Sequence, residues 1–186
     1  MNHELTFAHH DVDSAKPVVD QLVAVYLEAH EDDGPFYSED RYRRQLAAHM
    51  NVPGWSQVAA SLGDEMIGYI YGFPLPRGTR WWEGLQTPVP DDFTHETGRR
   101  TFALSELLVR PTWRRRGIAK ALHDELLNSR PEERATLLAR PDNEPAQATY
   151  AKWGWQKVAE LCPNWEHAPL FDVLLRPRTA PARNLL

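Results

Sequence analysis

The segment that most constrains the fold is a strand–turn–helix unit just past the middle of the chain. An apolar run, Leu107 to Val109, leads into a short turn and then into an amphipathic helix that begins near Ile118. The turn combines three arginines with two small residues: Arg114, Arg115, Arg116, Gly117 and Ala119. A helix that begins at such a turn presents unpaired backbone N–H groups and the positive end of its dipole. The segment therefore predicts a phosphate-binding turn, with arginines as additional donors.

This segment resembles motif A of the GNAT acyltransferases, which use acetyl-CoA as the acyl donor. The residues that match the motif are Val109, Pro111, Arg114, Gly117 and Ala119. The resemblance implies that backbone groups from Leu107 to Val109 hold the pantetheine arm and thioester, with an N–H near Val109 polarising the carbonyl. The cofactor-binding residues that it implies here are Leu107, Leu108, Val109, Arg114, Arg115, Arg116, Gly117, Ile118, Ala119 and Lys120. The alternative interpretation is a basic helix start on a solvated face.

A second segment, residues 143–155, resembles the family's Asn-x-x-Ala-x-x-x-Tyr-x-x-x-Gly-aromatic signature. Asn143 suits a helix N-cap and Gly154 suits the position that ends the helix. Asn143, Ala146 and Tyr150 lie at offsets 0, 3 and 7, so they share one helix face. We therefore expect all three to contact the cofactor. The alternative is a capped surface helix with a core tyrosine.

The length and patterning predict one α/β domain. With 186 residues and 42% hydrophobic content, the chain can bury a single core. The resemblance implies a GNAT-like fold: a central mixed, mostly antiparallel sheet flanked by about four helices, in the order β-α-α-β-β-β-α-β-α-β-β. Strands are expected at 4–9, 57–62, 66–73, 102–109, 135–139, 155–161 and 170–175, and helices from Ser14, over 39–50, and after Gly117 and Asn143. The domain would span 1–176, with an insertion at 74–100 and a tail at 177–186.

Two segments are candidates for the acceptor site. The insertion contains Trp81 and Trp82, and a tryptophan ring could stack on a cation or an apolar group. The loop after the first long helix carries Glu28, Asp32 and Asp33, which would suit a cationic amine. In each case a purely structural role is the alternative, because long loops often pack their own aromatic residues and acidic turns are often only solvated.

The chemistry of acetyl transfer directs attention to two further side chains. An alkyl ammonium with a pKa of about 10.4 must lose a proton before it can attack a thioester. Glu106 lies on the strand before the turn and alternates with Leu104 and Leu108, so burial would raise its pKa and make it the better base. A solvent-facing Glu106 is the alternative. Tyr150 resembles the family's general acid, although a phenol is an uphill donor to a thiolate by about 2 kcal/mol.

Charge distribution and cysteine content narrow the function classes. Residues 1–100 hold 16 acidic and 8 basic side chains, whereas residues 101–186 hold 10 and 13, so the basic half carries the cofactor motifs. A pI of 5.9 argues against a nucleic-acid partner.

The histidines lack metal-ligand spacing, so no metal is expected. No apolar run approaches a membrane span, and the single Cys162 with an unremarkable N-terminus favours a cytoplasmic protein without membrane partners.

The favoured function is transfer of an acetyl group from acetyl-CoA to a primary amine of a small molecule, by direct attack in a ternary complex. Two alternatives stay open: acetylation of protein N-termini or lysines, and a non-catalytic module that senses acyl-CoA. Homodimerisation also stays open, because the closing strands or the tail could pair with a second copy.

Overall fold

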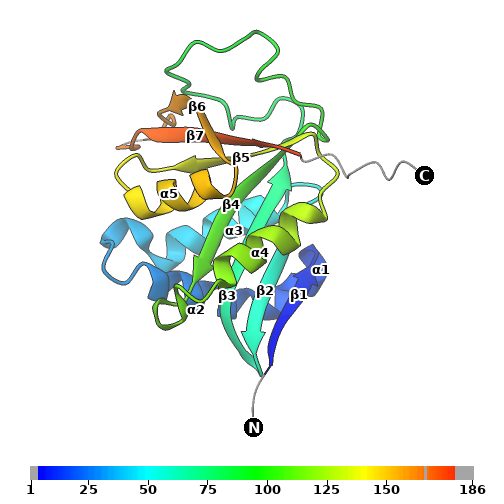
Figure 1. Cartoon of the computed structure of the whole chain (residues 1–186), viewed down its shortest axis with the longest axis vertical. Helices are drawn as coiled ribbons and strands as arrows, with labels where there is room; N and C mark the ends of the chain where they lie inside the picture. The colour runs from blue at the N-terminus through cyan, green and yellow to red at the C-terminus, as the bar shows by residue number, and fades with distance from the viewer. Residues whose placement is uncertain (1–3, 166, 179–186) are drawn as a thin grey trace, which may run out of the picture. The chain divides into compact units, whose positions relative to one another are not determined.

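The computed structural model describes residues 4–165 and 167–178. The chain divides into two compact units, Met1–Pro74 with Leu104–Arg130 and Leu75–Ala103 with Pro131–Leu186. In the described residues, seven strands are hydrogen-bonded in the order β1-β2-β3-β4-β5-β7-β6. Strand β4 (Thr101–Val109) contributes residues to both units, since the division falls between Ala103 and Leu104. The element order confirms the predicted α/β architecture (Figure 1).

The first unit is built on an antiparallel meander. Strand β1 (Leu5–His10) pairs with β2 (Ser56–Leu62), and β2 pairs with β3 (Glu65–Pro74) through the turn at Gly63 and Asp64. The helices of this unit are α1 (Val12–Ala15), α2 (Val19–Ala29), α3 (Glu39–Met50) and α4 (Ile118–Asn128), with short 3-10 turns η1 (Lys16–Val18), η2 (Pro35–Tyr37) and η3 (Pro111–Trp113). The predicted strand and helix positions agree to within one or two residues, apart from the first helix.

Helices cover both faces of this meander (Figure 1). Helix α4 packs on β2 and β3, with Ile118, Leu122 and Leu126 buried at helical spacing. On the opposite face α2 packs on β3, and Tyr42 of α3 meets Tyr69 of β3. That second face carries most of the polar groups of the candidate site.

The first helix begins differently from its prediction. Asp11, not Ser14, is the N-cap of α1: its carboxylate accepts from the Ser14 backbone N–H at 2.9 Å, and the Ser14 hydroxyl accepts from the Asp11 N–H at 3.0 Å. This reciprocal pair is a capping box. Pro17 lacks a backbone N–H, so the segment continues as a 3-10 turn before α2 begins at Val19.

The second unit combines parallel and antiparallel pairing. The first residues of β4, Thr101–Ala103, pair in parallel with β5 (Arg134–Ala139). Strand β7 (Phe171–Pro177) pairs antiparallel with both β5 and β6 (Gln156–Leu161), and α5 (Glu144–Lys152) precedes β6. Strand β7 extends beyond its predicted end and includes Pro177, the first residue of the predicted tail. The next residue, Arg178, is also held, because its N–H donates to the Glu133 carbonyl at 2.9 Å. Residues 179–186 lie outside the described residues.

The insertion forms no helix or strand of its own between residues 75 and 100, and it is held by hydrogen bonds within its unit. Its Gln86 N–H donates to the Glu160 carbonyl at 2.8 Å, and its Gly84 carbonyl accepts from the Cys162 N–H at 2.9 Å. The insertion therefore pairs along the outer edge of β6, beyond which it forms the long loop seen in Figure 1. Covering an edge strand in this way removes unpaired backbone groups from solvent.

Candidate active site

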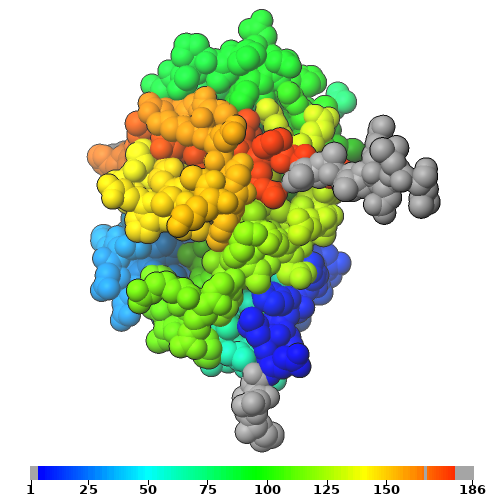
Figure 2. All heavy atoms as spheres, viewed as in Figure 1, coloured from blue at the N-terminus to red at the C-terminus, as the bar shows by residue number. Residues whose placement is uncertain are grey.

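The turn between β4 and α4 has the backbone shape that anion binding requires. Arg115 has φ 61° and Gly117 has φ 80°, so the turn twice enters the left-handed region. Gly117 is the N-cap of α4, and no side chain of the described residues caps that helix. Left-handed residues recur in turns that bind anions through backbone N–H groups, and the uncapped start of α4 leaves further donors available. The turn is exposed at the surface of its unit (Figure 2).

The arginines of the turn are not equivalent. Arg114 donates to the Val109 carbonyl at 3.2 Å and to the Ala29 carbonyl at 3.2 Å, so it holds the turn against α2. The Arg116 guanidinium stacks over the Trp113 ring at 4.7 Å, while Arg115 is exposed. Arg114 thus donates to backbone carbonyls, whereas the exposed Arg115 and the ring-stacked Arg116 keep their positive charge at the surface of the turn.

The acidic side chains expected at the acceptor site are largely paired within the protein. Glu28 forms an ion pair with Arg110, which also donates to the Met66 carbonyl at 2.8 Å. Asp33 pairs with His30 at 2.7 Å, whereas Asp32 is exposed. Glu28 thus anchors α2 to Arg110, the residue that begins the turn between β4 and α4.

Glu106 is held from α3. The Gln45 side-chain amide donates to Glu106 Oε1 at 3.1 Å. Burial among protein atoms raises the pKa of Glu106 from 4.5 to about 7, while the Gln45 hydrogen bond and the charge of Arg41 oppose that rise. The residue keeps only limited contact with solvent, in agreement with the desolvation that raises its pKa. A carboxyl group with a pKa near neutrality is suited to accept a proton.

The charge of Glu106 acts on four tyrosines: Tyr26, Tyr42, Tyr69 and Tyr71. Burial is the main cause that raises the pKa of each phenol, and the negative charge of Glu106 adds to the rise. The Tyr42 and Tyr69 hydroxyls lie 2.5 Å apart, and the Tyr26 and Tyr42 rings stack at 3.8 Å. The wall beside Glu106 is therefore aromatic and stays uncharged.

His49 supports the same wall. Its Nδ1 lies 3.1 Å from the Tyr71 hydroxyl and 3.2 Å from the Ser105 hydroxyl. Burial lowers the pKa of His49 to about 4, so the ring is neutral at neutral pH. Its contacts with the two hydroxyls connect α3 to Tyr71 of β3 and Ser105 of β4.

The second motif lies in the second unit. Asn143 is the N-cap of α5 and its Oδ1 accepts from the Ala146 N–H at 3.3 Å, as the sequence predicts. Tyr150 is half-buried, and its ring contacts Trp153 and Trp155 edge-on at 5.8 and 6.0 Å. These tryptophans fix the orientation of the phenol on the helix face that also carries Ala146.

The tryptophans of the insertion differ in their surroundings. Trp82 is buried, its Nε1 donates to Glu96 Oε1 at 3.1 Å, and its ring packs against Phe93 at 5.1 Å. Arg134 and Thr101 donate to the same Glu96 oxygen at 3.1 and 2.8 Å. Trp82 therefore packs inside the insertion, whereas Trp81 is half-buried.

The sequence-based predictions did not include Arg41, Gln45 or His49. These three residues lie at offsets 0, 4 and 8 on α3, so they form a polar stripe beside the buried Tyr42 and Leu46. The pattern that could have identified them in the sequence is the helical spacing of these polar side chains beside the apolar residues of the helix. Within the described residues, no group of three His, Cys, Asp or Glu could hold a metal, and no helix is long and apolar enough to cross a membrane.

Taken together, the strand order, the uncapped glycine turn and the buried carboxylate on the strand before it define an acyltransferase-type α/β protein. Residues 19–155 match the sequence model of the acetyltransferase (GNAT) family, and the chain belongs to that family. Its resemblance to the family is thus confirmed, as is the fold class. The chain has no significant match among curated proteins.

Solved structures with similar folds include three acetyltransferases. The ribosomal-protein-S18-alanine N-acetyltransferase of Escherichia coli is 14% identical, with a TM-score of 0.67, and the match covers 98% of this chain and 99% of that one. An aminoglycoside 6'-acetyltransferase type Ii is 20% identical, with a TM-score of 0.66 and coverages of 95% and 99%. PaiA N-acetyltransferase from Thermoplasma acidophilum, solved with coenzyme A, is 10% identical, with a TM-score of 0.59 and coverages of 94% and 99%.

Proposed function

We propose that this protein transfers the acetyl group of acetyl-CoA to the primary amine of a small molecule. The observation that carries the proposal is Glu106, a carboxyl group with its pKa raised to about 7 on the strand that leads directly into an anion-binding turn. The turn suits the donor because its uncapped N–H groups and the exposed Arg115 match the phosphates of coenzyme A. The coenzyme A bound in the PaiA structure supports the same donor.

In the proposed reaction Glu106 takes a proton from the acceptor ammonium, and the resulting amine attacks the thioester carbon. The carbon–nitrogen bond forms as the carbon–sulfur bond breaks, and Tyr150 stabilises or protonates the departing thiolate. The products are an N-acetylated amine, coenzyme A and one proton released to solvent. An N–H near Val109 would stabilise the negative charge on the carbonyl oxygen during this step.

The relative from Escherichia coli is named for an alanine of a ribosomal protein, and another relative is named for an aminoglycoside. Their TM-scores of 0.67 and 0.66 are nearly equal, so similarity of fold favours neither kind of acceptor. A small acceptor is supported by the aromatic wall beside Glu106. A role of the insertion in binding the acceptor would rest on Trp81, because the Trp82 ring is packed within the insertion.

The proposal is tested by measuring release of the coenzyme A thiol from acetyl-CoA with amino acids, polyamines, aminoglycosides and peptides as acceptors. With an accepted amine, Glu106→Gln should lower kcat/KM by roughly 100-fold or more while acetyl-CoA binding persists. Tyr150→Phe should lower kcat and leave the amine KM nearly unchanged. Turnover of peptides alone would favour the protein-acetylating alternative. Tight acetyl-CoA binding without turnover of any amine would favour the sensor.

A further inference from the structure

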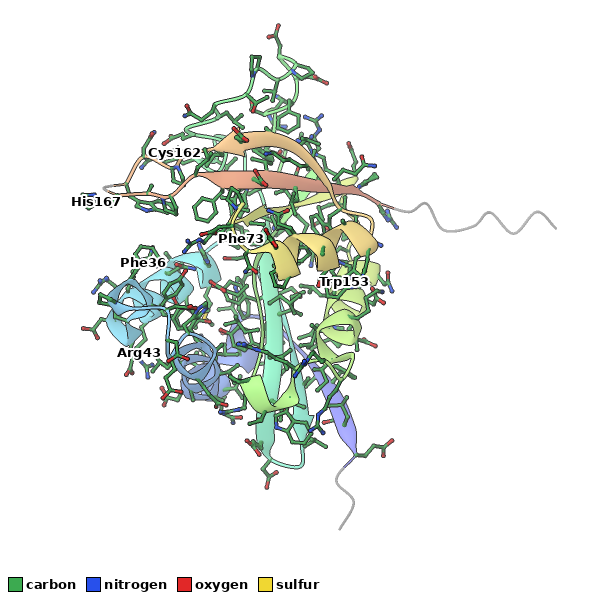
Figure 3. The ribbon with its side chains drawn as sticks, turned by 60° about the vertical axis from the view of Figure 1, so that its left-hand side comes forward. Phe36, Arg43, Phe73, Trp153, Cys162 and His167 are labelled. Carbon is green, nitrogen blue, oxygen red and sulfur yellow. The ribbon has the colours of Figure 1, made fainter. Side chains whose placement is uncertain are left out.

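Arg41 occupies an unusual position in the first unit. It lies in the first turn of α3, and its guanidinium carbon is 3.6 Å from the centre of the Phe36 ring. Phe36 belongs to η2, the segment that leads into α3 (Figure 3). The aromatic ring covers one face of the guanidinium plane, and the side chain is half-buried. Stacking of this kind leaves the edge of the guanidinium, where the N–H donors lie, directed away from the ring.

Arg41 forms no ion pair with any carboxylate of the described residues, in contrast to its neighbours. Arg43, two residues on, is bound by Glu39 at 2.7 Å and by Asp20 at 2.9 Å. Arg110 is bound by Glu28. A half-buried cation without a counterion is costly, because it loses hydration and gains no opposite charge. An anion from outside the chain would offset that cost.

The charge of Arg41 acts at the proposed base. It lowers the pKa of Glu106 against the effect of burial, and it likewise lowers the pKa of the Tyr26 phenol, with which its side chain interacts. A cation at this point weakens the base and repels an ammonium group. Both effects oppose acetylation of a purely cationic acceptor. They are consistent with an acceptor that brings a negative group together with its amine.

We propose that Arg41 binds a carboxylate of the acceptor, so that the preferred acceptors are amino acids or similar molecules with an amine and a carboxylate. The inference rests on the proposed function and narrows its substrate class. A guanidinium edge matches a carboxylate with two parallel hydrogen bonds, and the Phe36 ring holds that edge in place. Gln45 lies one helical turn after Arg41 on α3 and donates to Glu106, so an acceptor whose carboxylate binds Arg41 would direct its amine toward Glu106.

The same arrangement disfavours polyamines and aminoglycosides. Recognition of several positive charges requires several available carboxylates. Of the three acidic residues expected to supply them, Glu28 is paired with Arg110 and Asp33 with His30, whereas Asp32 is exposed to solvent. Glu106 is the carboxylate whose charge reaches the tyrosine wall, and the positive charge of Arg41 lowers its pKa. One acidic and one basic group match a zwitterion better than a polycation.

The test compares acceptors that differ only at the carboxylate. Phenylalanine, phenylalaninamide, phenethylamine and the aminophosphonate analogue of phenylalanine should be assayed beside the equivalent alanine and leucine series. The wild-type protein should use the amino acids with a kcat/KM roughly tenfold or more above those of the amides and amines, mainly through KM. Preference for the phosphonate over the carboxylate would overturn the proposed ligand.

The variants separate a binding role from a structural one. Arg41→Gln should remove the preference for the carboxylate, and Arg41→Lys should retain only part of it, because lysine keeps the charge without the planar fork. Arg44→Gln is the matched control, since Arg44 lies on the same helix and is exposed. Equal preference in the wild-type protein and Arg41→Gln would overturn the inference.

A binding measurement distinguishes failure of this inference from failure of the proposed function. Calorimetry on protein saturated with coenzyme A should detect carboxylate-bearing amines with the wild-type protein and not with Arg41→Gln. Such binding without turnover would support the Arg41 site while contradicting the proposed enzyme activity. Turnover confined to amines without a carboxylate would support the activity and overturn the Arg41 site.

Discussion

At the scale of single residues, the central feature is a carboxyl group whose protonation is balanced near neutrality. Burial raises the pKa of Glu106, and Gln45 with Arg41 limits the rise to about 7. Because the active form is the carboxylate, kcat/KM should increase with pH through about 7.

The raised pKa of Glu106 also means that the folded protein loses stability as pH rises from the unfolded value of 4.5 toward 7. Glu106→Gln mimics the protonated form, so it should be more stable than wild type at high pH only.

The contribution of Gln45 can be measured directly. Replacing it by leucine removes the hydrogen bond to Glu106 Oε1, so the pKa of Glu106 should rise further. The midpoint of the pH profile of kcat/KM should then move to a higher pH than in the wild-type protein. Gln21→Leu is the control, because Gln21 is an exposed glutamine on α2. An unchanged midpoint in Gln45→Leu would mean that the hydrogen bond does not control the base.

At the scale of elements, the turn before α4 illustrates how backbone shape selects a residue. Gly117 has φ 80°, and a Cβ added there would meet no heavy atom within 4 Å. Gly117→Ala should therefore cost about 1–2 kcal/mol of stability through its backbone conformation alone. It should also weaken acetyl-CoA binding, since the added methyl group lies where a phosphate would approach the N–H groups.

A second glycine provides the control for that experiment. Gly78 has φ 69° and equally open surroundings, but it lies in the insertion rather than in the turn. Gly78→Ala should lose similar stability in a thermal melt and bind acetyl-CoA as tightly as the wild-type protein does. If both variants bound acetyl-CoA equally well, the turn would not be the phosphate site.

At the scale of the whole molecule, β4 connects the two units because its residues belong to both. Glu96 is buried in the second unit and pairs with Arg134 at 3.1 Å. Removing the carboxylate in Glu96→Ala leaves the partly buried Arg134 guanidinium without this ion-pair partner, which should cost up to about 3–5 kcal/mol. Because the units share a strand, urea unfolding should remain a single transition at a lower midpoint, by fluorescence and circular dichroism.

The control for this prediction is Glu83→Ala in the same insertion. Glu83 pairs with Arg80 at 3.0 Å, and both side chains are exposed, so the loss of stability should be much smaller than in Glu96→Ala. Two separate unfolding transitions in Glu96→Ala would show that the units unfold independently. Equal losses in both variants would show that the buried pair adds no stability beyond that of a surface pair.

The sequence by itself determined the element order, the glycine turn before α4 and the Asn143 cap, because these depend on neighbours a few residues apart. Strand alternation, helical periodicity and cap chemistry act at short range, so they can be read along the chain. The first helix is an instructive exception. The capping box between Asp11 and Ser14 competes with a cap at Ser14 itself, and both patterns are local.

Only the tertiary structure decided what surrounds Glu106. Gln45 is 61 residues away in sequence, and the tyrosines come from α2, α3 and β3. A pKa depends on burial and on nearby charges in space, neither of which has a signature along the chain. The same reason explains why Glu28 is bound to Arg110 and why Trp82 is buried against Glu96, although each was a candidate for the acceptor site. The partners of Glu28 and Trp82 are thus determined by packing between residues that are far apart in the sequence.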